Sequence, residues 1–278
     1  MKTSFKTALA VMCSVSLMCG CASNGQNSRG AQYELNKRAA FAYSWMENSA
    51  EYRALCYQTY NAAYARIKDS LRDKSSKPRA IILDLDETVI NNIPAEATVN
   101  AFIKDSKDFG KNWDLWESLG RAEAMPGATE FLQKVDKLGV NIFYVSNRSC
   151  KNLEATQKNL KNLKFPLKNE VKCKDNSSNK KLRFEKIANE YNVVAYLGDN
   201  ANDFPINLYG VYSTERSKSV DKNSSLFGVK YFVLPNPVYG DWYHQMQPNF
   251  FRNSSEKMVE YVDASVKQDK KLKEEMLK

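Results

Sequence analysis

Several residue types that carry common enzyme chemistry are scarce in this chain of 278 residues. His244 is its single histidine, which excludes histidine phosphatases, Ser-His-Asp hydrolases with a second histidine, and zinc sites built on several histidines. The dinucleotide and P-loop patterns G-x-G-x-x-G and G-x-x-x-x-G-K-[ST] do not occur. No cysteine is followed six positions later by arginine, so a cysteine-based phosphatase loop is absent as well. With few partners in sequence, His244 is expected to have a structural role.

The N-terminal apolar stretch, Ala8 to Met18, is too short to span a bilayer comfortably. With Lys2 and Lys6 before it, it predicts a secretory signal peptide over residues 1–20. A small residue followed by Cys21 resembles the end of a bacterial lipoprotein signal, with Cys21 as the lipidated residue.

Ala22, directly after that cysteine, resembles the pattern of outer-membrane lipoproteins. We therefore expect a lipid-anchored protein of the bacterial outer membrane, attached to the membrane through acyl chains on Cys21. An ordinary cleaved signal peptide is the alternative. Residues 21–32, rich in Ser, Asn and Gly, predict a flexible tether to a domain over residues 33–278.

The net charge says little about binding partners, and the remaining cysteines say little about disulfide pairing. There are 41 Lys and Arg against 32 Asp and Glu, a net charge of +9. Such a surface favours anionic partners, but the basic residues are scattered, so no nucleic-acid partner is expected. Beyond Cys21 only Cys56, Cys150 and Cys173 remain, which allow at most one internal disulfide of undetermined pairing.

Short apolar runs alternate with helical patterns along the rest of the chain. The runs that predict buried strands are Arg79–Asp86, Asn141–Ser146, Val193–Gly198 and Lys230–Pro235. Helices are predicted over 127–138, 151–163 and 180–191, with one or two helices carrying a buried aromatic stripe over 33–71 and a charged peripheral helix over 254–278. This alternation indicates an α/β fold with a mainly parallel, Rossmann-like sheet and flanking N- and C-terminal helices.

Polar residues follow three of these predicted strands, where ligands bind in such sheets. The first strand brings Asp84 and Asp86, the second Ser146, and the third Asp199 with Asp203 after it. Lys180 or its neighbour Lys181 opens the helix before the third strand.

Grouped carboxylates at a buried strand end are costly without a cation, and an oxygen-rich cluster suits Mg²⁺. A carboxylate can attack phosphorus, a second one can exchange protons with the leaving alcohol and with water, and a hydroxyl and a lysine can bind phosphoryl oxygens. The sequence therefore predicts a Mg²⁺-dependent phosphoryl-transfer site.

D-x-D-x-T, a strand ending in Ser, a lysine and G-D-N-x-x-D, in this order, are the motifs of haloacid dehalogenase-like phosphatases. More narrowly, the chain resembles the class C acid phosphatases, bacterial lipoprotein acid phosphatases that act as 5′-nucleotidases. The matching stretches cover nearly the whole chain after Cys21, namely Trp45–Tyr52, Ile82–Thr88, Met125–Ala128, Tyr144–Arg148, Ser178–Lys180 with Arg183 and Phe184, Gly198–Phe204, Val233–Asn236 and Tyr239–Trp242.

The resemblance implies a role for each matching residue. Asp84 is expected to be the nucleophile and a Mg²⁺ ligand. Asp86 is expected to be the general acid and base and to give its backbone carbonyl to the metal. Asp199 is then the third ligand, supported by Asp203. Ser146 and Lys180 are expected to bind the phosphoryl group. Lys180 is chosen over Lys181 because it falls in the family's Ser-Asn-Lys register.

The segment over 91–125 lies where this family has a small helical cap. Trp113 and Tyr239 match positions that contact the base in relatives, so they are candidates for stacking on a nucleobase or nicotinamide, while Trp116 is expected in the core of the cap. The resemblance also leaves a homodimer open.

These observations predict an acid phosphatase that hydrolyses small phosphomonoesters, nucleoside monophosphates and nicotinamide mononucleotide among them, through an aspartyl-phosphate. A phosphotransferase with the same intermediate and an inactive nucleotide-binding surface lipoprotein are the alternatives.

Overall fold

The computed structural model describes residues 20–102, 106–174, 176–212 and 214–277. The predicted signal peptide over residues 1–20 lies outside these residues except for its last position. No helix in the described ranges is both long and apolar enough to cross a bilayer.

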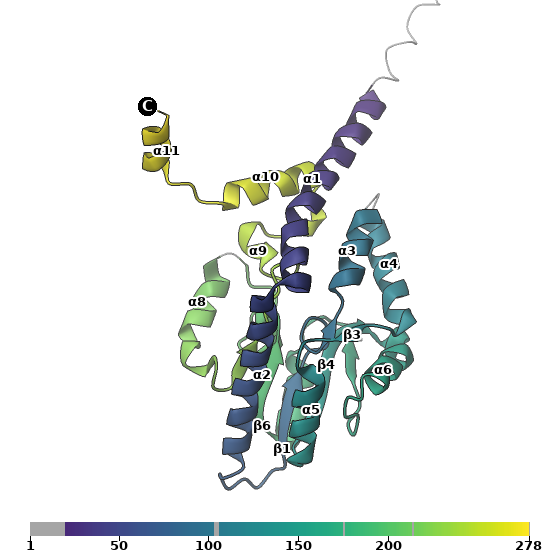
Figure 1. The fold of residues 1–278 in the computed structure, drawn as a ribbon, viewed down its shortest axis with the longest axis vertical. Helices are drawn as coiled ribbons and strands as arrows, with labels where there is room; N and C mark the ends of the chain where they lie inside the picture. The colour runs from purple at the N-terminus through teal and green to yellow at the C-terminus, as the bar shows by residue number, and fades with distance from the viewer. Residues whose placement is uncertain (1–19, 103–105, 175, 213, 278) are drawn as a thin grey trace, which may run out of the picture.

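A five-stranded sheet forms the centre of the molecule, in the order β5-β4-β1-β6-β7 (Figure 1). Its strands are β1 (Arg79–Leu83), β4 (Asn141–Ser149), β5 (Lys172–Lys174), β6 (Asn192–Gly198) and β7 (Tyr231–Val233). All neighbouring pairs are parallel, which confirms the predicted α/β class. The sequence missed β5, because three residues that include two lysines do not form an apolar run.

Helices cover both faces of this sheet (Figure 1). They are α2 (Ala50–Ser70), α5 (Ala128–Lys137), α6 (Leu153–Asn162), α7 (Lys181–Glu190) and α8 (Thr214–Lys222). The chain also contains four short 3₁₀ turns, η1 (Cys150–Asn152), η2 (Ala201–Asp203), η3 (Ser224–Leu226) and η4 (Phe250–Arg252). On β1, Ile81 and Leu83 belong to the hydrophobic cluster that includes α2 and α5. Ala80 and Ile82 belong to the cluster that includes α7. Because successive strand residues point to opposite faces, a strand that is apolar at every position needs cover on both sides.

The N-terminal segment forms two helices, α1 (Gly20–Asn48) and α2. Ser49 separates them, and its side chain caps α2 by accepting a hydrogen bond from the Tyr52 backbone nitrogen at 3.0 Å. The composition predicts a flexible tether over 21–32, whereas the structure continues α1 through this stretch. Extending a helix that has already nucleated gains one hydrogen bond per residue, so residues of low propensity can be added.

The aromatic stripe of these helices is only partly buried. Tyr52 and Tyr60 are buried, but Phe41 is 84% exposed, and Leu55 and Tyr57 are exposed as well. The prediction that the whole stripe is core was therefore wrong for three residues. A helix buries only the stripe that faces its neighbours, which are α3 (Ile93–Phe102) and α10 (Ser255–Ser265) for α1 and the sheet with α5 for α2.

The predicted cap is an insertion between two short strands, β2 (Ile90–Asn91) and β3 (Glu123–Ala124), which pair antiparallel. It consists of α3 (Ile93–Phe102) and α4 (Ser106–Leu119), which stand together above one side of the sheet in Figure 1. The chain therefore enters the cap through β2 and returns to the sheet domain through β3, and these two connections lie next to each other.

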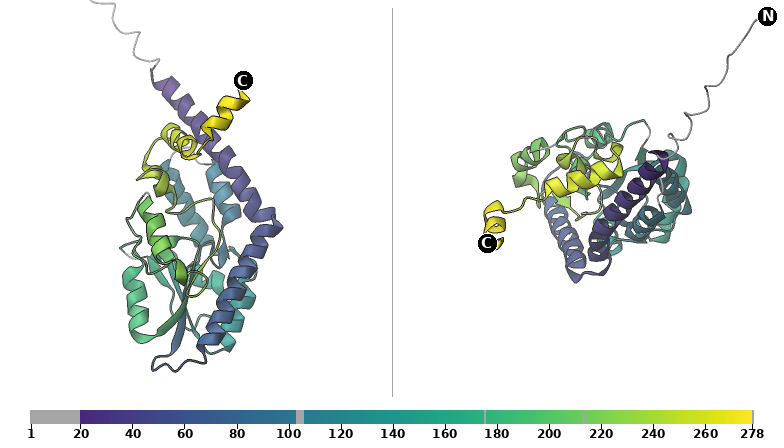
Figure 2. Two further views of the ribbon diagram at one scale, coloured as in Figure 1. Left: turned by 90° about the vertical axis from the view of Figure 1, so that its left-hand side faces the viewer. Right: turned by 90° about the horizontal axis from the view of Figure 1, so that it is seen from above.

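The C-terminal segment contains α9 (Tyr243–Met246), α10 (Ser255–Ser265) and α11 (Lys270–Met276). A single peripheral helix was predicted over 254–278, but the structure shows two, because the chain leaves the helix at Val266. Both helices have side-chain N-caps, from Ser254 and Asp269. Figure 2 shows α10 alongside α1, and the two helices are in contact.

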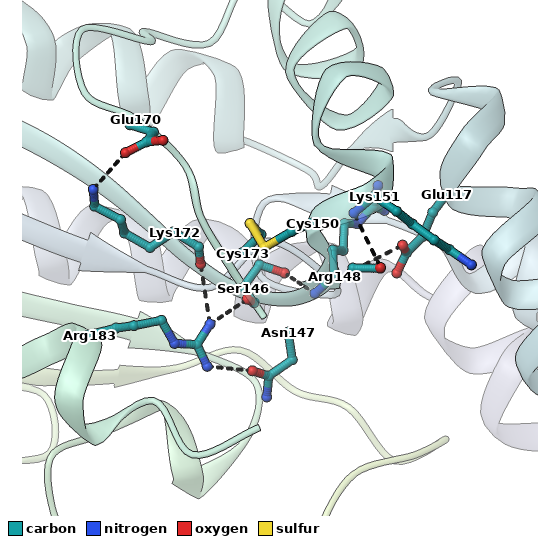
Figure 3. Close-up of a disulfide and its surroundings, with 11 residues drawn as sticks. Glu117, Ser146, Asn147, Arg148, Cys150, Lys151, Glu170, Lys172, Cys173 and Arg183 are labelled. Carbon is teal, nitrogen blue, oxygen red and sulfur yellow. Dashed lines mark hydrogen bonds and ion pairs between the residues drawn. A yellow bond between two sulfur atoms is a disulfide. The ribbon is translucent and has the colours of Figure 1, made fainter. Parts of the chain in front are cut away.

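Cys150 and Cys173 form a disulfide, while Cys56 is free and buried. The bond joins Cys150, directly after β4, to the edge strand β5, next to the polar C-terminal part of β4 (Figure 3). Arg183 adds a second link there, donating hydrogen bonds to the Ser146 carbonyl (2.6 Å) and the Lys172 carbonyl (3.3 Å).

Loss of this disulfide is expected to lower the free energy of unfolding. Cross-linking residues separated by 23 positions reduces the entropy of the unfolded chain, an effect of about 3 kcal/mol. Urea unfolding of the oxidised protein and of the double variant Cys150→Ser/Cys173→Ser measures this difference. A reducing agent should destabilise the native protein and leave the double variant unchanged. Equal unfolding midpoints for the two oxidised proteins would contradict the expectation.

Candidate active site

Three carboxylates meet at the carboxyl edge of the central strands. Asp84 directly follows β1, Asp199 directly follows β6, and Asp203 ends the short turn η2. One carboxylate oxygen of each lies within 4.8 Å of the others. The parallel pairing of β1 with β6 brings these residues together, since it places both strand ends at one edge.

Lys180 supplies a cation to this cluster. Its Nζ lies 2.7 Å from Asp84 Oδ1 and 2.6 Å from Asp203 Oδ1, and its side chain is 3% exposed. Burial lowers the pKa of Lys180, but attraction to Asp203 and Asp84 outweighs this and raises it overall. The neighbouring Lys181 is exposed and lies near Glu185, so the structure places Lys180, as predicted, in the site.

Asp86 points to a second group of polar side chains. Its Oδ1 lies 2.8 Å from Arg148 Nη2 and accepts a hydrogen bond from Asn92 Nδ2 at 2.8 Å. Its Oδ2 lies 3.4 Å from the donating hydroxyl of Ser146, which is fully buried. The carboxylate is thus held in one orientation, close to the hydroxyl expected to bind phosphate.

Two residues that fix the site were not among the predicted site residues. Arg148 binds Asp86 from the polar C-terminal part of β4. Asn236 donates a hydrogen bond to Asp199 Oδ2 at 2.8 Å. Both lie in stretches that resemble the family, and Asn236 follows the fourth predicted strand. Its position directly after the run Lys230–Pro235 is the sequence signal that points to it.

Gly198 allows the Asp199–Asp203 loop to fold tightly. A Cβ atom at this position would lie 2.2 Å from the Cβ of Asp203, far closer than two carbons can approach. Asp203 also accepts a hydrogen bond from the Asn200 backbone nitrogen at 3.0 Å. Glycine is therefore required for the packing of Asp203 under the strand end, where it reaches Lys180.

The cluster carries more negative charge than Lys180 can balance. Burial raises the pKa of Asp84 to about 7 from an ordinary value of 3.8, against the opposing effect of Lys180. Burial, with Asp203 and Asp84 nearby, raises the pKa of Asp199 well above its usual range. Three oxygen donors around one point with excess negative charge are the donor set that a hard divalent cation prefers. These residues therefore fit a divalent metal.

A cavity of about 850 Å³ opens above these groups. Its walls come from the cap, from α1, from the loop after β7 and from α10. Trp113 and Tyr239, the predicted stacking residues, both line it, as does His244. Trp116 instead donates a hydrogen bond to Asn92 at 2.8 Å and packs against the core, as expected. α10, part of the predicted peripheral C-terminal helix, has no buried residue, but its Met258 and Val262 line this cavity.

The fold and the site share four features that define a class of proteins. These are a parallel α/β sheet, an acidic cluster at its carboxyl edge, a buried lysine in that cluster and a cavity covered by a cap. Residues 1–242 match the family model described as "HAD superfamily, subfamily IIIB (Acid phosphatase)". The class C acid phosphatase of Bacillus anthracis is 32% identical, with a TM-score of 0.80 over 84% of this chain and 99% of that one. Its tungstate-bound crystal structure gives a TM-score of 0.79.

Curated plant proteins are more distant relatives. Acid phosphatase 1 of Solanum lycopersicum is 24% identical over 160 residues, 57% of each chain. The stem 28 kDa glycoprotein of Glycine max is 26% identical over 178 residues, 60% of this chain and 63% of the relative. The chain thus spans less than two-thirds of the length of these curated relatives. It belongs to subfamily IIIB of the HAD superfamily, the acid phosphatases, and among these it is similar to the class C proteins.

The metal-free protein is expected to lose stability as the pH rises from about 4 to about 7. Asp84 keeps a proton in the folded state up to a pKa of about 7, whereas in the unfolded chain it loses the proton near 3.8. Between these values the folded state binds more protons, so raising the pH favours unfolding. Asp199, Glu87 and Glu96, whose pKa values burial also raises, act in the same direction.

Thermal unfolding in EDTA across this pH range measures the effect. Asp84→Asn should give a shallower decline, and added Mg²⁺ should restore stability at pH 8, because a ligand that binds only the folded state stabilises it. A midpoint that stays level or rises with pH in EDTA would contradict the assignment of this cluster.

Proposed function

We propose that this protein is a Mg²⁺-dependent phosphomonoesterase that hydrolyses nucleoside monophosphates through an aspartyl-phosphate. The observation that carries this proposal is the position of Asp84, at the base of a large cavity with Lys180 at 2.7 Å and two further carboxylates beside it. Membership of the acid phosphatase subfamily supports the reaction class.

In the first step, a carboxylate oxygen of Asp84 attacks the phosphorus atom, and the bond from phosphorus to the ester oxygen breaks. The departing alkoxide takes a proton from the carboxyl group of Asp86. Lys180 and the Ser146 hydroxyl bind phosphoryl oxygens, where negative charge is concentrated in the transition state. The Arg148 contact holds the Asp86 carboxyl facing the cavity during this transfer.

In the second step, a water oxygen attacks the same phosphorus atom. Asp86, now a carboxylate, takes a proton from that water, and the bond between phosphorus and Asp84 breaks. Inorganic phosphate leaves, and both aspartates return to their starting protonation states. Burial of the site limits the access of other nucleophiles to the phosphoryl group.

Asp84 and Asp199, with Asp203 in support and the backbone carbonyl of Asp86, would hold the metal. When bound, a divalent cation supplies positive charge that lets an anionic phosphate approach an anionic carboxylate. Asn236 and Thr88 keep Asp199 oriented, since both donate to its carboxylate, at 2.8 and 3.4 Å.

The cavity wall supports a nucleotide as substrate. Trp113 and Tyr239 offer aromatic rings in the same cavity as the acidic cluster, and such rings stack on flat heterocycles, including nucleobases and nicotinamide. Hydrolysis would convert charged nucleotides, nicotinamide mononucleotide among them, into nucleosides that can be taken up as nutrients.

Asp84→Asn is expected to lower the turnover of p-nitrophenyl phosphate and AMP by about 10³-fold or more, because the nucleophile is lost. Phosphate release with Mg²⁺ measures this, and EDTA should abolish activity of the native protein until Mg²⁺ is restored. Asp73→Asn, at an exposed position, is the matched control and should be fully active.

Full turnover by Asp84→Asn would disprove the covalent mechanism. Phosphate transfer to added ethanol would indicate phosphotransferase activity through the same intermediate. Nucleotide binding without phosphate release, in Mg²⁺ or in EDTA, would instead show an inactive binding protein.

We further propose that the protein is exported and anchored to the outer membrane through Cys21. The Cys150–Cys173 disulfide supports export, because such bonds persist in oxidising compartments. Cells expressing the full chain with radiolabelled palmitate should yield a labelled protein in the outer-membrane fraction. Cys21→Ser should lose the label, and Cys56→Ser should keep it. If the native protein carries no label, the lipid anchor is disproved and the alternative of an ordinary cleaved signal peptide holds.

A further inference from the structure

The active-site cavity has a wall built from two segments that lie at opposite ends of the chain. Ala39 and Ala42 of α1 line it on one side, and Met258 and Val262 of α10 line it beside them. The family match ends at residue 242, so α10 lies outside the part of the chain that defines the subfamily. Figure 2 shows the two helices side by side over one end of the molecule.

Specific contacts hold this wall in place. Arg38 of α1 forms an ion pair with Asp263 of α10. Phe250, which precedes α10, is buried and packs its ring on Tyr243, with ring centres 4.9 Å apart. Tyr243 in turn donates a hydrogen bond to the Val238 carbonyl at 2.7 Å. The wall is therefore fixed to the loop that carries Tyr239, rather than suspended in solvent.

The two ends of the cavity differ in chemistry. The phosphate end is lined by Asp84, Asp86, Asp199 and Asp203 together with Lys180 and Arg148. The wall offers the apolar side chains of Ala39, Ala42, Met258 and Val262, with Asn36 and Arg38 of α1 beside them. A small phosphomonoester offers no ring to place against this wall. A ring-containing leaving group, in a cavity of about 850 Å³, has room to extend from Asp84 toward it and bury apolar surface there.

We propose that α10 is a specificity element, with Met258 and Val262 binding the organic leaving group of nucleoside-sized phosphomonoesters. This proposal rests on the proposed function of the same site. The two residues act through substrate binding and contribute nothing to the bond changes at phosphorus. Substitution there is expected to alter KM for large substrates and to leave kcat for small ones unchanged.

Two variants test the wall in opposite ways. Met258→Ala/Val262→Ala removes its apolar surface, and Val262→Trp fills the space beside it. Because α10 has no buried residue, both variants should fold, which circular dichroism and thermal unfolding verify. Lys257→Ala/Glu260→Ala is the matched control, since it removes two exposed side chains from the same helix.

Steady-state kinetics are measured with AMP and with ethyl phosphate, whose leaving group is too small to reach the wall. Met258→Ala/Val262→Ala should raise KM for AMP about tenfold, the effect expected from losing the burial of one or two methylene groups. Val262→Trp should also raise KM for AMP, because its ring occupies space that the leaving group needs. kcat/KM for ethyl phosphate should change less than twofold, and the control should match the native protein. Equal losses for both substrates, or none for AMP, would overturn the proposal.

Binding of adenosine, the leaving group alone, is measured by calorimetry and does not need turnover. The wall variants should weaken adenosine binding about tenfold, in line with the KM effect. If the native protein hydrolyses no phosphomonoester but its adenosine binding weakens in the variants, the proposed function fails and the role of α10 stands. If adenosine binds native and variant proteins equally, the role of α10 fails whatever the activity.

Discussion

The contact of the Lys180 ammonium with Asp84 and Asp203 is the interaction on which the rest of the site depends. A buried lysine is stable only with partners, and buried carboxylates at a strand end repel one another without a cation. The ammonium and the carboxylates thus offset each other's cost of burial. The negative charge that Lys180 leaves unbalanced favours binding of a divalent metal. Gly198 and the tight loop after β6 exist in this form because Asp203 must reach Lys180.

Around this pair, the parallel sheet acts as the common frame. Four strand ends contribute to one edge: Asp84 from β1, Ser146 and Arg148 from β4, Asp199 from β6 and Asn236 from β7. The disulfide and Arg183 hold the C-terminal part of β4 from the side of β5. The cap, α1 and α10 enclose the cavity above this edge. The sheet edge therefore carries the groups proposed to act at phosphorus, and the surrounding helices carry those proposed to select the leaving group.

Much of this organisation follows from local sequence pattern. Four of the five sheet strands were predicted, because a strand buried on both faces must be apolar throughout. The polar residues at three strand ends were predicted because they terminate those apolar runs, whereas the position of the cap was predicted from the resemblance to the family. β5 and the extent of α1 were not, since a three-residue edge strand and a helix extended through polar residues leave no periodic signal.

The sequence by itself determined the strand-ending residues, their order and their resemblance to class C acid phosphatases, because these are properties of short contiguous segments. Only the tertiary structure decided that Lys180 rather than Lys181 is buried, that Arg148 and Asn236 orient two of the aspartates, and that Cys150 pairs with Cys173. It also decided that α10 lies on α1 beside the cavity. Each of these depends on which distant segments come within a few ångströms, a result of packing and chain path that no local pattern encodes.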